Sequence, residues 1–362
     1  MELGFAAFGD ANWDPETGRR ISEAQAIRNV VESAVLADQV GLDWFGIGEH
    51  HTPEFPASAG APILAAIAAQ TTRIKLSTAV NVLSTDDPVR VYEQYSTVDA
   101  ISNGRVELIP GRGSSIESFP LFGYDLRDYD TLFAEKLELL LEINQNERVV
   151  WKGKTRPDLN GEYVPPRAEH GPIPIWLGVG GNPGSVLRAA KLGLPMATGV
   201  LGGSAIRSAG IATLYRRAAE ELGNTPQQTL LTVGSPGFLM KDGKKARDFW
   251  WPHWHQFMSV VGQQRGFLPP TRESYDRDTG PQGGMLVGSP EEIVERILLM
   301  HEHWGQDRSF IHADMGAVPQ KEVLKAIELY GTVVRPAVQA ELGTTTIDER
   351  LGRTPQPIRA AA

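Results

Sequence analysis

Two hydrophobic periods alternate along the chain. Short apolar runs, such as residues 3–9 (LGFAAFG) and 44–48 (WFGIG), predict buried β-strands. Each run precedes a segment in which apolar residues recur every three or four positions, which predicts a helix. Residues 22–41, for example, place Ile27 and Val31 on one helical face. Further strand-like runs cover residues 74–83, 106–111, 173–179, 194–200, 230–240 and 309–317.

Eight strand-like runs, each followed by a helix, predict an α/β protein with an all-parallel sheet. Eight strands close a (β/α)8 TIM barrel, and we favour that fold over an open doubly wound sheet. We expect one barrel domain over residues 1–340 and a loose polar tail over residues 341–362. Long loop insertions are expected at the C-terminal face of the barrel, at residues 111–130, 151–174 and 263–288. The last of them is the candidate lid.

Composition narrows the class of protein. The 362 residues include no cysteine, which excludes disulfides, thiolate metal sites and cysteine nucleophiles. The formal net charge is −9 and basic residues form no stripe, so we expect no nucleic acid partner. The chain has no apolar run of membrane-spanning length and no positively charged N-terminal leader. We therefore expect a cytoplasmic protein without a membrane partner.

Polar residues end the second strand abruptly, in the sequence FGIGEHHTPEFP of residues 45–56. Catalytic residues of a barrel lie at the C-terminal ends of its strands, so Glu49, His50 and His51 are candidate site residues. Because side chains alternate along a strand, we expect one histidine to face the site and the other to pack under a loop. Histidine titrates near neutral pH and suits general acid or base catalysis. The alternative is that these histidines are structural.

Histidine spacing elsewhere does not indicate a metal site. His253 and His255 lie two positions apart on a predicted helix, and so do His301 and His303. Side chains at that spacing diverge, whereas zinc needs three or four convergent ligands. We therefore expect no metal.

A glycine-rich turn follows the fifth strand, in the sequence GVGGNPGSVLRAA of residues 178–190. Glycines allow an anion to approach the backbone, and the amides of a helix start bind it. The turn, with Gly180, Gly181 and Ser185, thus predicts a site for a phosphate or a mononucleotide. The turn is less consistent with a dinucleotide site, because Pro183 stands where the G-x-G-x-x-G sequence of such sites has its third glycine. Arg112, after the fourth strand, could reach the same anion; the alternatives are a plain turn and a solvated arginine.

With these motifs placed, the chain resembles the bacterial luciferase-like family of flavin-dependent oxidoreductases. The resemblance extends from GLDWFGIGEHHTPEF through ISNGRVELIPGRG and PIWLGVGGNPGSVLRAAKLGLPM to VGSPEEIVERI. It implies a (β/α)8 barrel that binds reduced FMN at the C-terminal ends of its strands. His50 matches the active-site histidine of luciferase, which assists the reaction with oxygen, and His51 matches the histidine beside it.

The resemblance also assigns cofactor-binding positions. Arg112, Gly181, Asn182 and Ser185 match positions that hold the flavin phosphate, and Ala79-Val80 matches a non-proline cis peptide beneath the isoalloxazine ring. The chain departs from luciferase at Gly111, where luciferase has a reactive cysteine. This departure puts the luciferase substrate in doubt.

The resemblance implies a two-component FMN-dependent monooxygenase that acts on a small organic substrate. A separate flavin reductase is an implied partner, since the sequence has no nicotinamide fingerprint, and family members commonly form homodimers. One alternative is a dehydrogenase that uses the deazaflavin coenzyme, whose acidic tail would need basic residues such as Arg105 and Arg127. Another is a flavin-binding protein without catalysis.

Overall fold

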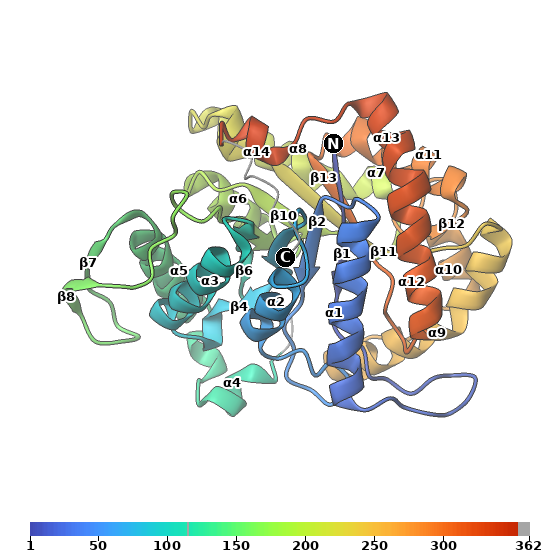
Figure 1. Cartoon of the computed structure of the whole chain (residues 1–362), viewed down its shortest axis with the longest axis horizontal. Coiled ribbons are helices and arrows are strands. Elements are labelled where there is room, and N and C mark those ends of the chain that lie inside the picture. The colour runs from blue at the N-terminus through green and yellow to red at the C-terminus, as the bar shows by residue number, and fades with distance from the viewer. Residues whose placement is uncertain (114–115, 354–362) are drawn as a thin grey trace.

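In the computed structural model, which describes residues 1–113 and 116–353, eight parallel strands form one curled sheet with helices around it (Figure 1). In order along the sheet they are β5 (Val106–Glu107), β3 (Lys75–Thr78), β2 (Trp44–Ile47), β1 (Glu2–Ala7), β13 (Arg308–His312), β11 (Leu231–Leu239), β10 (Met196–Gly199) and β9 (Leu177–Val179). All eight fall on the predicted runs, so the prediction of a parallel α/β sheet is confirmed.

The two edge strands, β5 and β9, approach each other through a single bridge. Leu108 pairs in parallel with Ile175. The Leu108 amide donates to the Pro174 carbonyl at 2.9 Å, and the Trp176 amide donates to the Leu108 carbonyl at 2.8 Å. These bonds hold the edges of the curled sheet near each other.

Helices connect the strands and cover the outer side of the sheet (Figure 1). They are α1 (Glu23–Gln39), α2 (Gly60–Ala68), α3 (Pro88–Ser102), α4 (Ser118–Phe122), α5 (Tyr129–Gln145), α6 (Pro183–Lys191), α7 (Ala205–Ser208), α8 (Gly210–Glu221), α9 (Gly243–Arg265), α10 (Arg272–Asp278), α11 (Pro290–Trp304), α12 (Gln320–Leu329), α13 (Arg335–Leu342) and α14 (Ile347–Arg350). In the described part of the chain, no helix is both long and apolar enough to cross a bilayer.

A buried ion cluster fills the sheet near the N-terminal ends of its strands. The fully buried Arg308 guanidinium donates to the carboxylates of Glu2 and Glu107, with four nitrogen–oxygen distances between 2.6 and 3.1 Å. The indole rings of Trp44 and Trp176 each lie within 5.3 Å of the guanidinium carbon. Paired charges and large rings therefore fill this end of the curled sheet.

The candidate lid, residues 263–288, is not one long loop. It contains the end of α9, the whole of α10, and strand β12 (Leu286–Gly288), which pairs in parallel with β11. The prediction that this segment is one long loop is therefore wrong, because it forms a helix and a strand that extends the sheet. Its role as a lid stays a prediction. Residues 151–174 likewise contribute β8 (Leu159–Tyr163), which forms an antiparallel hairpin with β7 (Arg148–Trp151) just before it. Short strands β4 (Asn81–Val82) and β6 (Pro110–Gly111) pair in parallel.

The expected loose tail is ordered up to residue 353. The Ile347 amide of α14 donates to the Glu2 carboxylate at 2.7 Å, and Asp348 pairs with Lys75 at 2.5 Å. Burial of Ile347 and these polar contacts fix α14 against the N-terminal ends of the strands. Residues 354–362 of the predicted tail lie outside the described residues.

Candidate functional site

A cavity of about 750 Å³ lies at the C-terminal ends of the strands. This volume is within the range of roughly 300–1,000 Å³ typical of cofactor and small-molecule sites. Its lining includes Phe8, Glu49, His50, His51, Phe55, Ala79, Val80, Gly111, Arg112, Glu117, Tyr129, Gly178, Gly180, Ser185, Phe257, Met258, Arg265, Phe310 and His312. The cavity thus contains both chemical groups that the sequence singles out, the histidine pair and the arginine with its glycine-rich turn.

Both histidines line the cavity, so the prediction that one packs away from the site is wrong. Strand β2 ends at Ile47, and beyond it the backbone no longer alternates its side chains between two faces. His50 contacts the rings of Phe8 and Phe55, each at a centroid distance of 5.1 Å. The two histidines have different carboxylate partners.

Glu49 joins His51 to the neighbouring strand. Its Oε1 lies 3.0 Å from Nε2 of His51, while its Oε2 accepts from the Asn81 side chain and the Val82 amide, both at 2.9 Å. Glu49 therefore contacts both a histidine ring and the backbone of a loop. It has no acceptor oxygen left uncommitted.

His50 is paired with Glu117, a residue that the sequence analysis missed. Nδ1 of His50 lies 3.1 Å from Oε1 of Glu117, which is on the segment leading into α4. Burial acts to raise the pKa of Glu117, but hydrogen bonds from His50 and from backbone amides outweigh it and lower this pKa. Because the carboxylate accepts, the hydrogen is on Nδ1, and Nε2 of the neutral ring remains a proton acceptor.

The peptide bond between Ala79 and Val80 is cis, as the resemblance implies. The Val80 side chain lies between two glycines of neighbouring segments. A Cβ on Gly111 would come within 2.6 Å of Val80, and one on Gly178 within 2.9 Å. The absence of a side chain at residue 111, where luciferase has cysteine, is therefore required by the position of Val80.

Arg112 and Ser185 meet at the start of α6, as predicted. Nη2 of Arg112 donates to Oγ of Ser185 at 3.0 Å, and Nη1 pairs at 2.9 Å with Asp130, an exposed carboxylate. Gly180 borders the same space, and a Cβ there would meet no atom within 4 Å. This arrangement leaves room for an anion beside a guanidinium, a hydroxyl and a helix start.

Two of the predicted phosphate ligands lie elsewhere. Neither Gly181 nor Asn182 is among the described residues that line the cavity. Gly181 makes the turn, with φ of +83°, and the Asn182 side chain caps α6 by accepting from the Gly184 amide at 2.8 Å. Gly181 thus shapes the turn and Asn182 starts the helix, while their part in holding a phosphate stays a prediction.

His312, at the end of β13, is the second missed residue. Its ring is 6% exposed, lines the cavity and lies 4.5 Å from the ring of Phe8. The same criterion that selects His50, a polar residue at the carboxyl end of a strand, would have selected it from the sequence. Glu117, in contrast, lies in a long loop where no periodicity marks it.

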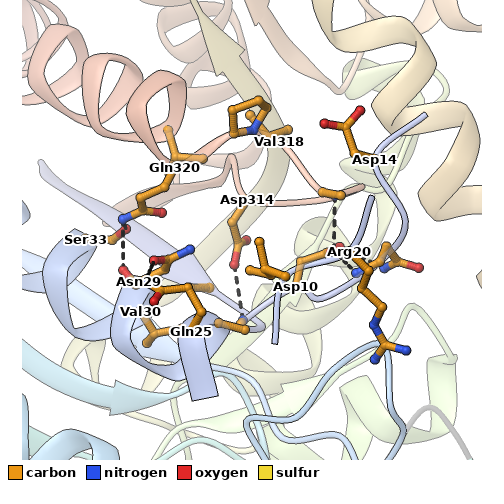
Figure 2. Close-up of a pocket in the computed structure, with 18 of the residues that line it drawn as sticks. Asp10, Asp14, Arg20, Gln25, Asn29, Val30, Ser33, Asp314, Val318 and Gln320 are labelled. Carbon is orange, nitrogen blue, oxygen red and sulfur yellow. Dashed lines mark hydrogen bonds between the residues drawn. The ribbon is translucent and has the colours of Figure 1, made fainter. Parts of the chain in front are cut away.

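A second, smaller pocket has a volume of about 470 Å³ (Figure 2). It is lined by the segment after β1, by α1 and by the segment after β13. Oδ2 of Asp314 accepts from the amides of Phe8 and Gly9 at 3.1 and 3.2 Å. Burial, followed by the nearby Asp10 carboxylate, raises the pKa of Asp314 to about 7. Asp314 thereby holds the backbone of Phe8, whose ring contacts both His50 and His312.

The cavity lining brings several kinds of chemical group together. Among the described residues, no three His, Asp or Glu side chains are grouped so that they could hold a metal ion. Arg112, the cis peptide of Ala79-Val80 and His50 border one continuous cavity.

Comparison with known proteins agrees with this geometry. The pattern of the luciferase-like monooxygenase family matches residues 1–307. Uncharacterized protein y4vJ of Sinorhizobium fredii is 26% identical over 91% of this chain and 96% of its own length. The F420-dependent glucose-6-phosphate dehydrogenase of Amycolatopsis mediterranei is 28% identical over 42% of this chain and 48% of its own.

Solved structures show the same fold. Monooxygenase RslO1 from Streptomyces bottropensis has a TM-score of 0.78 at 22% identity, covering 93% of this chain and 99% of its own. The FMN-bound oxygenating constituent of 3,6-diketocamphane monooxygenase from Pseudomonas putida has a TM-score of 0.72 at 21% identity, covering 93% and 98%. The family pattern matches most of the length of this chain, and the chain therefore belongs to the luciferase-like monooxygenase family.

Proposed function

We propose that this protein is the oxygenase of a two-component system, which takes reduced FMN from a separate flavin reductase and oxidises a small organic substrate with O2. The observation that carries the proposal is that two features border the same cavity: the paired Arg112 and Ser185, which could hold a single phosphate, and His50 with its carboxylate partner. The sheet is proposed to be a (β/α)8 barrel, supported by the bridge between Leu108 and Ile175.

The residues present fit FMN. Arg112, Ser185 and Gly180 would hold its phosphate, which would compete with Asp130 for the Arg112 guanidinium. Ala79 and Val80 would support the ring, and the aromatic side chains Phe8 and Phe55 would exclude water from it. When bound, reduced FMN supplies the two electrons with which O2 is split between the substrate and water.

The protein's own contribution to this chemistry is proton handling. His50 can accept a proton at Nε2 while Glu117 stabilises the resulting imidazolium through Nδ1. His51 is fixed by Glu49, whose other oxygen is bonded to the β4 backbone, so we assign it an orienting role.

A deazaflavin-dependent dehydrogenase is the second candidate, because an F420-dependent enzyme is among the relatives. Its coenzyme has a longer acidic tail, for which Arg105 and Arg127 were the possible partners. Arg105 is buried and donates to the carbonyls of Ser102, Ile74, Ala68 and Thr71. Arg127 is fully exposed and paired with Asp125 at 2.6 Å. Because neither lines the cavity, FMN is favoured.

Anaerobic titration with reduced FMN, followed by admission of O2, tests the proposal. We expect saturable binding, and reoxidation of the bound flavin at a rate that changes when His50 is replaced by alanine. Binding of the deazaflavin coenzyme but not of FMN would contradict the proposal and support the dehydrogenase.

A further inference from the structure

Two short loops, at the carboxyl ends of β1 and β13, hold each other through a pair of carboxylates. Oδ2 of Asp314 accepts from the amides of Phe8 and Gly9, at 3.1 and 3.2 Å. In return, the Asp10 carboxylate accepts from the amides of residues 316–317, at 2.8 and 3.1 Å. We call this reciprocal arrangement the carboxylate clasp.

The clasp is also the partition between the two pockets. Phe8 and Met315 line the larger cavity, whereas Gly9, Asp10 and Asp314 line the smaller pocket (Figure 2). Neighbouring residues of each loop therefore face opposite pockets, and a displacement of either loop changes the shape of both.

Phe8 is the residue of the clasp that lies nearest to the candidate chemistry. Its ring is 5.1 Å from the ring of His50 and 4.5 Å from that of His312. Strand β1 ends one residue before Phe8, and the chain turns at Gly9 with φ of +67°. The two bonds to Asp314 thus fix the Phe8 backbone where the strand itself has ended.

The two carboxylates of the clasp differ in the donors that they receive. Asp10 also accepts from the amide and the side chain of Asn12, at 2.8 and 3.0 Å, so both of its oxygens are bonded. Oδ1 of Asp314 is buried with no hydrogen-bond partner among the residues that the structure describes. A negative charge there would lack a donor and lie near a second carboxylate. Burial, followed by Asp10, accordingly raises the pKa of Asp314 to about 7.

Other charged groups face the clasp from the elements around it. Those that line the smaller pocket are Asp14, Arg19 and Arg20, from the loop after β1, while the lining residues of α1 and α12 are uncharged. Arg20 is bonded to a backbone carbonyl outside the clasp and points away from Asp314 (Figure 2), and Arg19 is exposed. On α9, Nδ1 of His253 lies 2.7 Å from the Gly316 carbonyl oxygen, and burial lowers the pKa of this histidine. The clasp therefore depends on the proton of Asp314 rather than on a paired cation.

We propose that Asp314 is a positioning residue, whose protonated form holds the Phe8 ring beside His50 and His312 and whose ionisation loosens the clasp and displaces this wall of the larger cavity. The inference rests on the proposed function in taking that cavity to bind FMN. An acid whose pKa is raised by folding destabilises the folded arrangement once it is ionised. FMN should therefore bind more weakly as the pH rises through about 7.

Histidine NMR reports the position of the wall without a cofactor, because the Phe8 ring shifts the resonances of the protons on His50 and His312. These resonances are assigned in protein with isotope-labelled histidine, from the spectra of His50→Gln and His312→Gln. Asp314→Asn keeps an acceptor oxygen without a charge, so it should show the low-pH spectrum of wild type at every pH. Asp314→Leu has a similar shape but no acceptor, so it should shift both resonances and weaken FMN binding about tenfold.

A pH titration of the same spectra tests the proton. Burial, followed by His50, lowers the pKa of His312 to about 3, so this ring stays uncharged near neutral pH. An inflection of its resonance at about pH 7 would thus report a neighbouring group. We expect this inflection to persist in His50→Gln and to vanish in Asp314→Asn.

Asp38→Leu is the matched control. Asp38 is also a buried carboxylate that binds the backbone of a distant loop, through the amides of Thr72, Arg73 and Ile74, but it lines neither pocket. Its replacement should lower the melting temperature and leave the resonances of His50 and His312 and the FMN affinity unchanged.

Unshifted histidine resonances in folded Asp314→Leu would overturn the proposal, and so would equal shifts in Asp38→Leu. An inflection of the His312 resonance that survives in Asp314→Asn would also overturn it. If Asp314→Leu does not fold, the comparison of wild type with Asp314→Asn across the pH range decides. If wild type does not bind FMN, the proposed function fails, while the spectra of the cofactor-free protein still decide the role of Asp314.

Discussion

Replacing Gly180 by alanine tests the phosphate site without disturbing the fold. A Cβ on Gly180 would meet no atom within 4 Å, whereas neighbouring Gly181 needs its positive φ of +83°. Alanine also restricts the unfolded chain. We therefore expect the free energy of unfolding of Gly180→Ala to be unchanged or to rise by up to about 1 kcal/mol.

The same methyl group should obstruct the phosphate. An oxygen that approaches the Gly180 backbone to roughly 3 Å would overlap the methyl carbon, so the phosphate must shift away from Ser185 or Arg112. A charge-assisted hydrogen bond is worth about 1.5–3 kcal/mol. Losing one should weaken FMN binding roughly ten- to hundredfold.

Flavin fluorescence titration measures this affinity, and two glycine variants serve as comparisons. Gly210→Ala, in α8 and also in open space, should leave FMN affinity unchanged. Gly178→Ala should lower stability, because its Cβ would be 2.9 Å from Val80. If folded Gly180→Ala binds FMN as tightly as wild type, the phosphate does not lie at this turn.

Three further outcomes are expected. Glu117→Gln should slow reoxidation of bound reduced FMN about fivefold, through weaker support of protonated His50, with FMN affinity unchanged; an unaltered rate would contradict the pairing. Arg308→Met should lower the free energy of unfolding, measured in urea, by about 3–5 kcal/mol, because two buried carboxylates lose their partner. The pKa of Asp314 is raised from 3.8 to about 7, so its stabilising contribution, about 4 kcal/mol, is complete below about pH 4 and lost as the pH rises through 7. Urea melts should show a flatter pH dependence for Asp314→Asn than for wild type, and equal slopes would refute this assignment.

Strand order and the position of the site could be predicted from the sequence, because each depends on local pattern. Apolar runs mark parallel strands, and polar residues that end them mark one edge of the sheet. His50, Arg112 and Ser185 were found in this way, and the structure brings all three to one cavity. The positions of the two histidines relative to each other were not predictable, since strand alternation stops where β2 stops at Ile47.

Contacts between distant segments could not be predicted. Glu117 lies 67 residues from His50 and comes from a loop whose path follows no period. Arg308 and Glu2 begin their strands and Glu107 ends the two-residue β5. Charged residues at strand ends are equally typical of solvent-exposed positions. The curling of the sheet brings these three side chains together in its interior.

The depth of the cavity depends on pairs of large and small side chains across the sheet. The Phe310 ring lies over Gly234, where a Cβ would come within 2.1 Å of it, and the Phe8 ring lies over Gly48, where a Cβ would come within 2.3 Å. Each glycine therefore lets a ring lie low against the neighbouring strand. A larger residue at either position would displace a ring that lines the cavity, and so change its volume without removing any polar group of the site. Glycines in these strands thus contribute to function through volume, which hydrophobic patterning does not record.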